Sequence, residues 1–219
     1  MKKLLIFDLD GTLLNTLTDL TNAVNFALDK YHYESKSEEY VRKAIGNGVA
    51  ILISRCLENG MDNPFYTDCL NTFREYYRKH YLDNTKPYEN MRKALMDLKK
   101  YGYKLAVVTN KIDSIAKELI NHYFKGLFEM IQGDTKTLEK KPSPDMVNHV
   151  LEKLSINRED ACYIGDTNID YDTAYNSKMD VLLVTYGYRT REELKNLYDV
   201  DMVNTPLEIS EYFKNTTRK

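Results

Sequence analysis

The sequence predicts an α/β fold: a doubly wound parallel sheet with a Rossmann-like core and an inserted helical cap domain. Short apolar runs, typical of strands buried on both faces, recur along the chain. Helical patterns separate the later runs, and strands that alternate with helices form parallel sheets. A long stretch, residues 15–84, shows helical patterns only. The apolar runs are Leu4–Phe7, Leu105–Val108, Ala161–Ile164 and Val181–Val184.

The elements of the core follow in order along the chain. The first run, Leu4–Phe7, is flanked by charged residues, as expected of a buried strand. The helix before the second run ends at Gly102, because glycine favours helix termini. After the third run a helix starts near Ile169 and ends at Asn176. Functional residues are expected at the carboxyl ends of the strands.

Residues 15–84 are predicted to form four helices and to serve as a small cap. Residues 1–14 and 85–219 then form the α/β core around the sheet. The alternative is a separate helical domain with no role in the site. The predicted helices are Leu17–Leu28, one that runs from a capping box at Ser35–Glu38 to Gly46, Val49–Leu57, and one from Pro64 towards Tyr81.

Composition bounds the class of protein. The chain has 219 residues, 42% hydrophobic and 29% charged, which is typical of a globular protein. The net charge of −2, with acidic and basic residues mixed, argues against a nucleic-acid partner. The 3 cysteines lack C-x-x-C spacing, which fits a reducing compartment. No apolar run reaches the roughly 18 residues of a membrane span or forms a signal peptide. We therefore expect a cytoplasmic protein; its oligomeric state is not readable.

Polar motifs stand at the predicted strand ends. Taken singly, each has a structural explanation, since Asp favours turns and Thr favours helix N-caps. In this order, and at these places between strands and helices, the combination is very hard to produce by chance. The motifs are Asp8-Leu9-Asp10-Gly11-Thr12, Thr109-Asn110, Lys141-Pro142-Ser143-Pro144, and Gly165-Asp166-Thr167-Asn168-Ile169-Asp170.

This set of motifs resembles the haloacid dehalogenase-like hydrolases, over almost the whole chain. The helical insertion after the first motif is similar to the small cap of that family. Thr185-Tyr186-Gly187-Tyr188 and Ile45-Gly46-Asn47-Gly48 look like the phosphoglycolate phosphatase branch. The resemblance implies a Mg²⁺-dependent phosphatase that acts on a small phosphorylated metabolite, with 2-phosphoglycolate as the first candidate, through an aspartyl-phosphate on Asp8.

Other readings stay open. A pyrophosphatase, a nucleotide or sugar phosphatase, or a phosphoglucomutase of the same superfamily is the main alternative. Asn15, where the mutases have Asp, together with Thr12, argues against a mutase without excluding it. Pro87-Tyr88-Glu89-Asn90 replaces the Pro-Gly turn of many relatives and leaves the hinge geometry open. A non-catalytic phosphometabolite-binding protein is the alternative of another class, but no motif residue is missing.

The chemistry explains why such motifs are needed. Phosphate monoesters hydrolyse so slowly that a catalyst must supply about 20 kcal/mol or more. A covalent route with Asp8 as nucleophile divides the reaction into two displacements. Mg²⁺ prefers carboxylates, phosphate oxygens and water, and it offsets the repulsion between carboxylate and phosphate. The resemblance implies that the side chains of Asp8 and Asp166 and the backbone carbonyl of Asp10 hold the metal. Asp170 then holds the metal's water shell or Lys141.

The remaining roles are also implied by the resemblance. Asp10 gives a proton to the leaving group and later takes one from water. The Thr109 hydroxyl binds a phosphate oxygen, and Lys141 places a positive charge at the phosphoryl group and steadies Asp8. The expected substrate-binding residues are Gly11, Thr12, Asn110 and Asn47.

Substrate selectivity is assigned to the cap. Gly46-Asn47-Gly48 precedes a predicted helix, and the free amides at a helix N-terminus attract anions. We hypothesise that this turn, with Arg42 or Lys43 nearby, binds the carboxylate of a small acid. The alternative is that the glycines merely end one helix and begin the next. The cap is expected to swing about the segments near Asn15 and residues 84–87.

Overall fold

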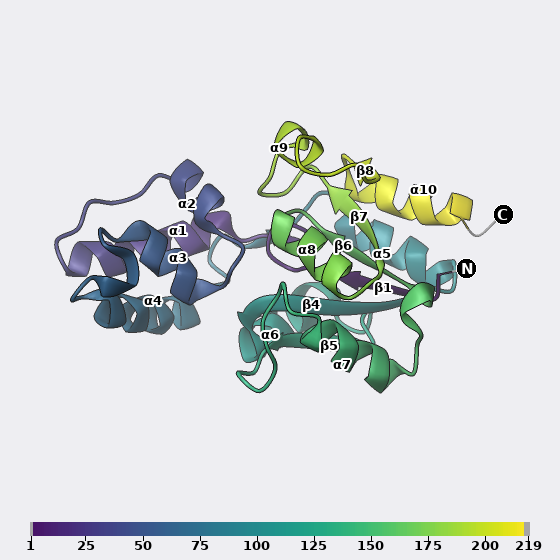
Figure 1. The fold of residues 1–219 in the computed structure, drawn as a ribbon, viewed down its shortest axis with the longest axis horizontal. Helices are drawn as coiled ribbons and strands as arrows, with labels where there is room; N and C mark the ends of the chain where they lie inside the picture. Colours follow the sequence, from purple (N-terminus) through teal and green to yellow (C-terminus); the bar gives the residue numbers. More distant parts are fainter. Residues whose placement is uncertain (1, 217–219) are drawn as a thin grey trace. The chain divides into compact units, whose positions relative to one another are not determined.

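The computed structural model describes residues 2–216 and contains a parallel sheet of six strands (Figure 1). The strand order is β5-β4-β1-β6-β7-β8, so the chain winds outward from β1 first in one direction and then in the other. This is a doubly wound sheet, and the predicted fold class is confirmed. The strands are β1 (Leu4–Phe7), β4 (Lys104–Ile112), β5 (Met130–Asp134), β6 (Ala161–Gly165), β7 (Asp180–Val184) and β8 (Met202–Val203).

Helices cover both faces of the sheet. Leu4 and Ile6 of β1 pack in one cluster with Met146 and Val150. Because alternate residues of a strand point to opposite faces, Phe7 lies on the other face, where its ring meets Phe128 edge-on at 6.1 Å. The helices of this unit are α5 (Met91–Lys100), α6 (Asp113–Phe124), α7 (Asp145–Leu154), α8 (Asn168–Asn176), α9 (Arg191–Lys195) and α10 (Pro206–Thr216), with a short 3₁₀ turn at Arg158–Asp160.

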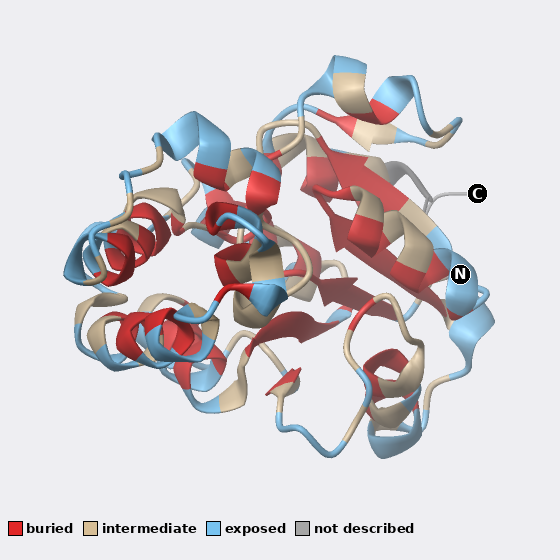
Figure 2. Ribbon diagram, turned by 60° about the vertical axis from the view of Figure 1, so that its left-hand side comes forward, coloured by how far each residue is buried: buried red, intermediate tan, exposed pale blue. Residues whose placement is uncertain are grey.

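A second compact unit spans Asn15–Lys86 and is helical apart from its ends. Its helices bury one face each against one another and expose the opposite face (Figure 2). Val24 and Leu28 of the first helix and Phe73 and Tyr77 of the last are among its buried residues. The helices are α1 (Leu17–Lys30), α2 (Glu38–Ala44), α3 (Val49–Cys56) and α4 (Tyr66–His80), with a 3₁₀ turn at Gly60–Asp62.

The two ends of this helical unit are joined by one buried carboxylate. Asp19, in the first turn of α1, accepts five hydrogen bonds of 2.8–3.0 Å from the backbone and side chains of Asn84 and Thr85. Beyond this clasp, the short strands β2 (Leu14–Asn15) and β3 (Lys86–Pro87) pair as a second sheet. The chain divides into Asn15–Lys86 and the remainder, whereas the predicted cap covers residues 15–84.

Several elements differ from the sequence-based expectation. The capping box expected at Ser35 is wrong: α2 begins at Glu38, and the hydroxyl of Ser37 accepts the hydrogen bond from the Tyr40 amide. The short strands β2, β3, β5 and β8 were not predicted. Within residues 2–216, no helix is both long and apolar enough to cross a bilayer.

Candidate active site

The predicted motifs lie at the carboxyl ends of three neighbouring strands. Asp8 directly follows β1, Thr109 lies near the end of β4, and Asp166 directly follows β6. β4 and β6 both pair with β1 in parallel, so these ends meet at one edge of the sheet. The direction of winding reverses here, which is where open α/β sheets bind ligands.

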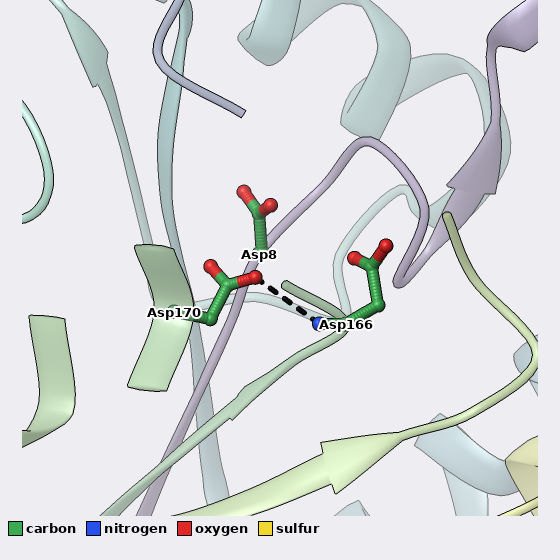
Figure 3. A group of neighbouring side chains, drawn as sticks. All are labelled: Asp8, Asp166 and Asp170. Carbon is green, nitrogen blue, oxygen red and sulfur yellow. Dashed lines mark hydrogen bonds between the residues drawn. The ribbon is translucent and has the colours of Figure 1, made fainter. Parts of the chain in front are cut away.

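Three carboxylates form the centre of the site. Asp8, Asp166 and Asp170 are buried and offer oxygen atoms that all lie within 4.8 Å of one another. Figure 3 shows the three carboxyl groups near the strand ends, and its dashed line marks the hydrogen bond that the Asp166 amide donates to an oxygen of Asp170. Buried carboxylates this close together require positive charge in the site.

Asp170 organises the loop that carries Asp166. Its Oδ2 accepts hydrogen bonds from the Asp166 amide at 3.1 Å, the Thr167 amide at 2.9 Å and the Thr167 hydroxyl at 2.8 Å. Gly165 makes room for it, since a Cβ there would come within 2.3 Å of Asp170 Cβ. Its other oxygen, Oδ1, accepts from Lys141 Nζ at 2.7 Å.

Lys141 supplies a buried ammonium between two carboxylates. Its Nζ lies 2.7 Å from Asp170 Oδ1 and 2.9 Å from Asp8 Oδ1. The Asp8 contact is an ion pair without a well-aligned hydrogen bond, because Asp8 Oδ1 has no hydrogen-bond partner in the described chain. Asn110 fixes the Lys141 backbone: its Oδ1 accepts from the Lys141 amide at 2.8 Å, and its Nδ2 donates to the Lys141 carbonyl at 3.0 Å.

The pKa values of the site reflect burial first and neighbouring charges second. Burial, opposed by Lys141, raises the pKa of Asp8 to about 7. Burial and the charges of Asp170 and Asp8 raise the pKa of Asp166 well above its usual range. Although burial lowers the pKa of Lys141, the carboxylates of Asp170 and Asp8 raise it well above its ordinary value. When all three carboxyl groups are ionised, they and the Lys141 ammonium leave two negative charges, which is the charge that a divalent cation neutralises.

Asp10 forms an ion pair with Lys111. Lys111 Nζ donates to Asp10 Oδ1 at 2.8 Å and to Oδ2 at 3.1 Å, and the Lys111 side chain is only 4% exposed. Lys111 was not among the predicted site residues. The signal available in the sequence is a lysine between Asn110 and Ile112, directly after an apolar strand run. A charged residue buried at a strand end needs a partner, and here the partner is Asp10.

The end of β4 is irregular where it carries Thr109. The pairing of β4 with β5 shifts register between Val108 and Ile112, which indicates a bulge. Gly133 of β5 permits it, because a Cβ there would lie 2.7 Å from the Lys111 carbonyl oxygen. Thr109 is 2% exposed, and its hydroxyl oxygen accepts from the Lys111 amide at 3.3 Å.

Gly11 and Thr12 lie in the loop after Asp10, but their polar groups point inward. The Gly11 amide donates to the Leu14 carbonyl at 2.9 Å. The Thr12 hydroxyl donates to Asp166 Oδ1 at 2.7 Å, and the Thr12 side chain is completely buried. The Thr12 hydroxyl, predicted to bind substrate, therefore binds the carboxylate of Asp166 in this structure.

Asn47 lies in the helical unit, whereas the carboxylate cluster belongs to the other unit. α3 begins after Gly48, whose φ of +81° suits glycine. Arg55 Nη2 donates to Asn47 Oδ1 at 2.9 Å, and Arg55 Nη1 donates to the Ala44 carbonyl at 2.7 Å. Arg55 thus holds the turn between α2 and α3.

The fold and the site define a hydrolase of the haloacid dehalogenase-like class. The model of the family "Haloacid dehalogenase-like hydrolase" matches residues 5–184, and the chain belongs to this family. The resemblance noted from the motifs is therefore confirmed.

Relatives within the family point to one branch. A phosphoglycolate phosphatase of Aquifex aeolicus is 34% identical over 191 residues, covering 85% of this chain and 86% of that protein. A phosphoglycolate phosphatase of Vibrio cholerae is 34% identical over 223 residues, covering 94% and 96%. The crystal structure of a predicted phosphoglycolate phosphatase from Haemophilus somnus, 27% identical, superposes with a TM-score of 0.89 and covers 97% of this chain and 98% of that one. The chain is thus similar to phosphatases of this branch in sequence and in fold.

Proposed function

We propose that this protein hydrolyses a small phosphomonoester, with 2-phosphoglycolate as the first candidate, through a phosphoryl group carried on Asp8. The observation that carries the proposal is the buried cluster of Asp8, Asp166, Asp170 and Lys141 at the ends of adjacent strands. Membership of the hydrolase family and the similarity to phosphoglycolate phosphatases support the substrate class.

The cluster fits a hard divalent cation, and we propose Mg²⁺. Oxygen donors suit this ion, the ionised cluster carries two more negative than positive charges, and Asp8 Oδ1 has an ion pair with Lys141 but no well-aligned hydrogen bond in the described chain. Asp8 and Asp166 would hold the ion through their side chains, and Asp10 would do so through its backbone carbonyl. When bound, the ion supplies positive charge that offsets the repulsion between a carboxylate and a phosphate dianion.

The first chemical step forms the bond between an Asp8 oxygen and phosphorus while the bond from phosphorus to the leaving oxygen breaks. Lys141, 2.9 Å from Asp8 Oδ1, limits the movement of the nucleophile and adds positive charge beside it. The Thr109 hydroxyl and the Asn110 amide are the proposed contacts of the phosphoryl oxygens. The Asn110 side chain has a second role, because it holds Lys141 in place.

Asp10 manages the protons. In its protonated form it donates a proton to the leaving alkoxide, and as a carboxylate it then accepts one from the water that attacks phosphorus. That attack breaks the bond from phosphorus to Asp8 and releases inorganic phosphate, so both carboxyl groups return to their starting state. Lys111 binds both oxygens of Asp10 and thereby fixes the direction of the side chain.

We further propose that the Asn47 side chain binds the carboxylate of the substrate. Arg55 occupies Asn47 Oδ1, which leaves the amide nitrogen of that side chain as the hydrogen-bond donor. The guanidinium also adds positive charge to the turn between α2 and α3. Asn47→Ala is expected to lower the rate on 2-phosphoglycolate relative to a neutral ester of similar size. Equal loss on both esters, or no loss, would contradict this role.

The test is phosphate release from a panel that contains 2-phosphoglycolate, other small esters, sugar phosphates, nucleotides and pyrophosphate, with Mg²⁺ or with EDTA. We expect turnover that requires Mg²⁺, is highest for 2-phosphoglycolate, and disappears in Asp8→Asn. Asp160→Asn is the control, since this carboxylate pairs with Lys3 at the opposite edge of the sheet. A folded protein that releases phosphate from none of these compounds would overturn the proposal.

A further inference from the structure

The segment Thr185–Tyr188 directly follows β7 and has no role in the mechanism above. Its backbone and side chains contact the loop that follows Asp10. The Tyr186 hydroxyl donates to the Thr12 carbonyl at 3.0 Å, and the Tyr188 amide donates to Asp166 Oδ2 at 2.7 Å. The segment therefore touches two parts of the site that are far apart in the sequence.

Thr12 closes this arrangement into a ring of contacts. Its hydroxyl donates to Asp166 Oδ1, while the Tyr188 amide donates to Asp166 Oδ2. Both oxygens of Asp166 thus have a donor, one from each side. Because Tyr186 holds the carbonyl of Thr12, it fixes the residue whose hydroxyl orients Asp166.

The contact is close enough to require glycine on both sides. A Cβ at Gly187 would lie 2.3 Å from the Gly11 carbonyl oxygen and 2.4 Å from Asp166 Cβ. A Cβ at Gly11, where φ is +89°, would lie 2.3 Å from Asp166 Oδ2. Asp166 is therefore closely enclosed between two backbone segments.

Tyr186 is itself held firmly. Its ring packs against Tyr88 with centroids 4.7 Å apart, and the Tyr88 amide donates to the Leu13 carbonyl at 3.4 Å. Burial, with Tyr88 and Asp166 nearby, raises the pKa of Tyr186 well above its ordinary value, so the hydroxyl stays a donor. Both tyrosines thus anchor consecutive carbonyls of one loop.

We propose that Tyr186 is a positioning residue for the divalent cation, which acts by holding Thr12 so that Asp166 presents its carboxylate to the ion. This inference rests on the proposed function, because it assumes that Asp166 holds a metal. Carboxylates that bind metals are themselves oriented by outer hydrogen-bonding partners, and loss of such a partner typically weakens metal binding about 10–100-fold.

The test compares Tyr186→Phe with Tyr103→Phe. The Tyr103 hydroxyl also donates to a carbonyl at 3.0 Å, that of Phe213, but Tyr103 precedes β4 and lies at the opposite edge of the sheet. Each variant loses one hydroxyl-to-carbonyl hydrogen bond. The dissociation constant of Mn²⁺, used as the probe ion, is measured by electron paramagnetic resonance, and that of Mg²⁺ by calorimetry, both without substrate.

We expect a roughly tenfold weaker cation affinity in Tyr186→Phe, with Tyr103→Phe within twofold of the wild type. Circular dichroism and thermal midpoints of both variants establish that they are folded to the same extent. Equal cation affinity in Tyr186→Phe and the wild type would overturn the inference and leave the proposed function intact. A wild-type chain that binds neither ion would overturn both.

Discussion

Burial and neighbouring charge act in opposite directions on Asp8. Burial favours the protonated acid, whereas Lys141 at 2.9 Å favours the carboxylate, and the balance raises the pKa of Asp8 to about 7 from 3.8. The nucleophile of the proposed reaction must be a carboxylate. A bound cation would lower this pKa, so cation binding and activation of Asp8 are coupled.

Without metal, stability should fall as the pH rises. The folded chain holds a proton on Asp8 up to about pH 7, whereas the unfolded chain loses it near pH 3.8. The folded state therefore binds more protons in this window, and the free energy of unfolding decreases from pH 4 to pH 7. Urea unfolding in EDTA should show a smaller decrease for Asp8→Asn, and Mg²⁺ should reduce the decrease in the wild type. Identical slopes for wild type and variant in EDTA would contradict this explanation.

Lys111 is expected to matter for rate through Asp10. Lys111→Met keeps the length of the side chain but removes the ammonium that binds both Asp10 oxygens. We expect kcat on an alkyl phosphate to fall roughly tenfold, a part of the usual contribution of acid–base catalysis, with little change in Mg²⁺ affinity. Lys117→Met is the control, because Lys117 pairs with Asp113 on the surface. A variant with the wild-type kcat would exclude a positioning role for Lys111.

At the scale of elements, the clasp at Asp19 connects the start of α1 with the chain that leaves α4. Asp19 is 2% exposed and Thr85 is 4% exposed, so the Thr85 amide and hydroxyl cannot turn to water when Asp19 is removed. Its position in the first turn of α1 also suits the positive end of the helix dipole. The clasp therefore holds the two ends of the helical unit together.

Asp19→Ala should destabilise the helical unit by about 3 kcal/mol, because the buried amide and hydroxyl of Thr85 lose their acceptor. Thr85→Val removes a single hydroxyl donor and should cost about 1 kcal/mol. Hydrogen exchange of the Asn84 and Thr85 amides measures the effect locally, and Asp29→Ala, exposed on the same helix, is the control. If these amides exchange no faster in Asp19→Ala than in the wild type, the clasp does not hold these ends.

The strands show what a sequence pattern can and cannot predict. Leu4–Phe7 was predicted with its bounds, because an apolar run buried on both faces is a strong signal. β5 was missed, since Met130–Asp134 contains Gln132 and Gly133 and so lacks a continuous apolar run. Gly133 has low strand propensity, but it makes room for the bulge of β4. Pairing across a sheet is a tertiary effect that local patterns do not carry.

The same division applies to the site. The carboxylates of the motifs could be predicted because the proposed chemistry, attack on phosphorus and binding of a cation, restricts the residue types that can perform it. Lys111, Tyr186 and Tyr188 could not, because their roles depend on distances across the fold: Tyr188 acts through its backbone amide, which leaves no trace in the residue type. The positioning roles of Lys111, Tyr186 and Tyr188 are therefore visible only in the structure.

At the scale of the whole molecule, the chain consists of a hydrolase-family core and a helical unit inserted in the sequence between β1 and β4. In the proposed mechanism, the phosphoryl group and the cation contact residues of the core only: Asp8, Asp10, Thr109, Lys141 and Asp166. Selectivity is proposed to come from the helical unit, so the chemical steps and the choice of substrate can be tested separately. The first question about the chemical steps is whether Asp8 becomes phosphorylated.

The most direct test uses Asp10→Asn with p-nitrophenyl phosphate and Mg²⁺. The leaving group of this ester departs without a proton, so Asp8 can still attack, but the variant lacks the base that activates water. We predict a burst of p-nitrophenolate equal to the enzyme concentration, followed by slow turnover, and one phosphoryl group on the peptide that contains Asp8 by mass spectrometry. Steady release without a burst, with Asp8 unmodified, would contradict the covalent mechanism.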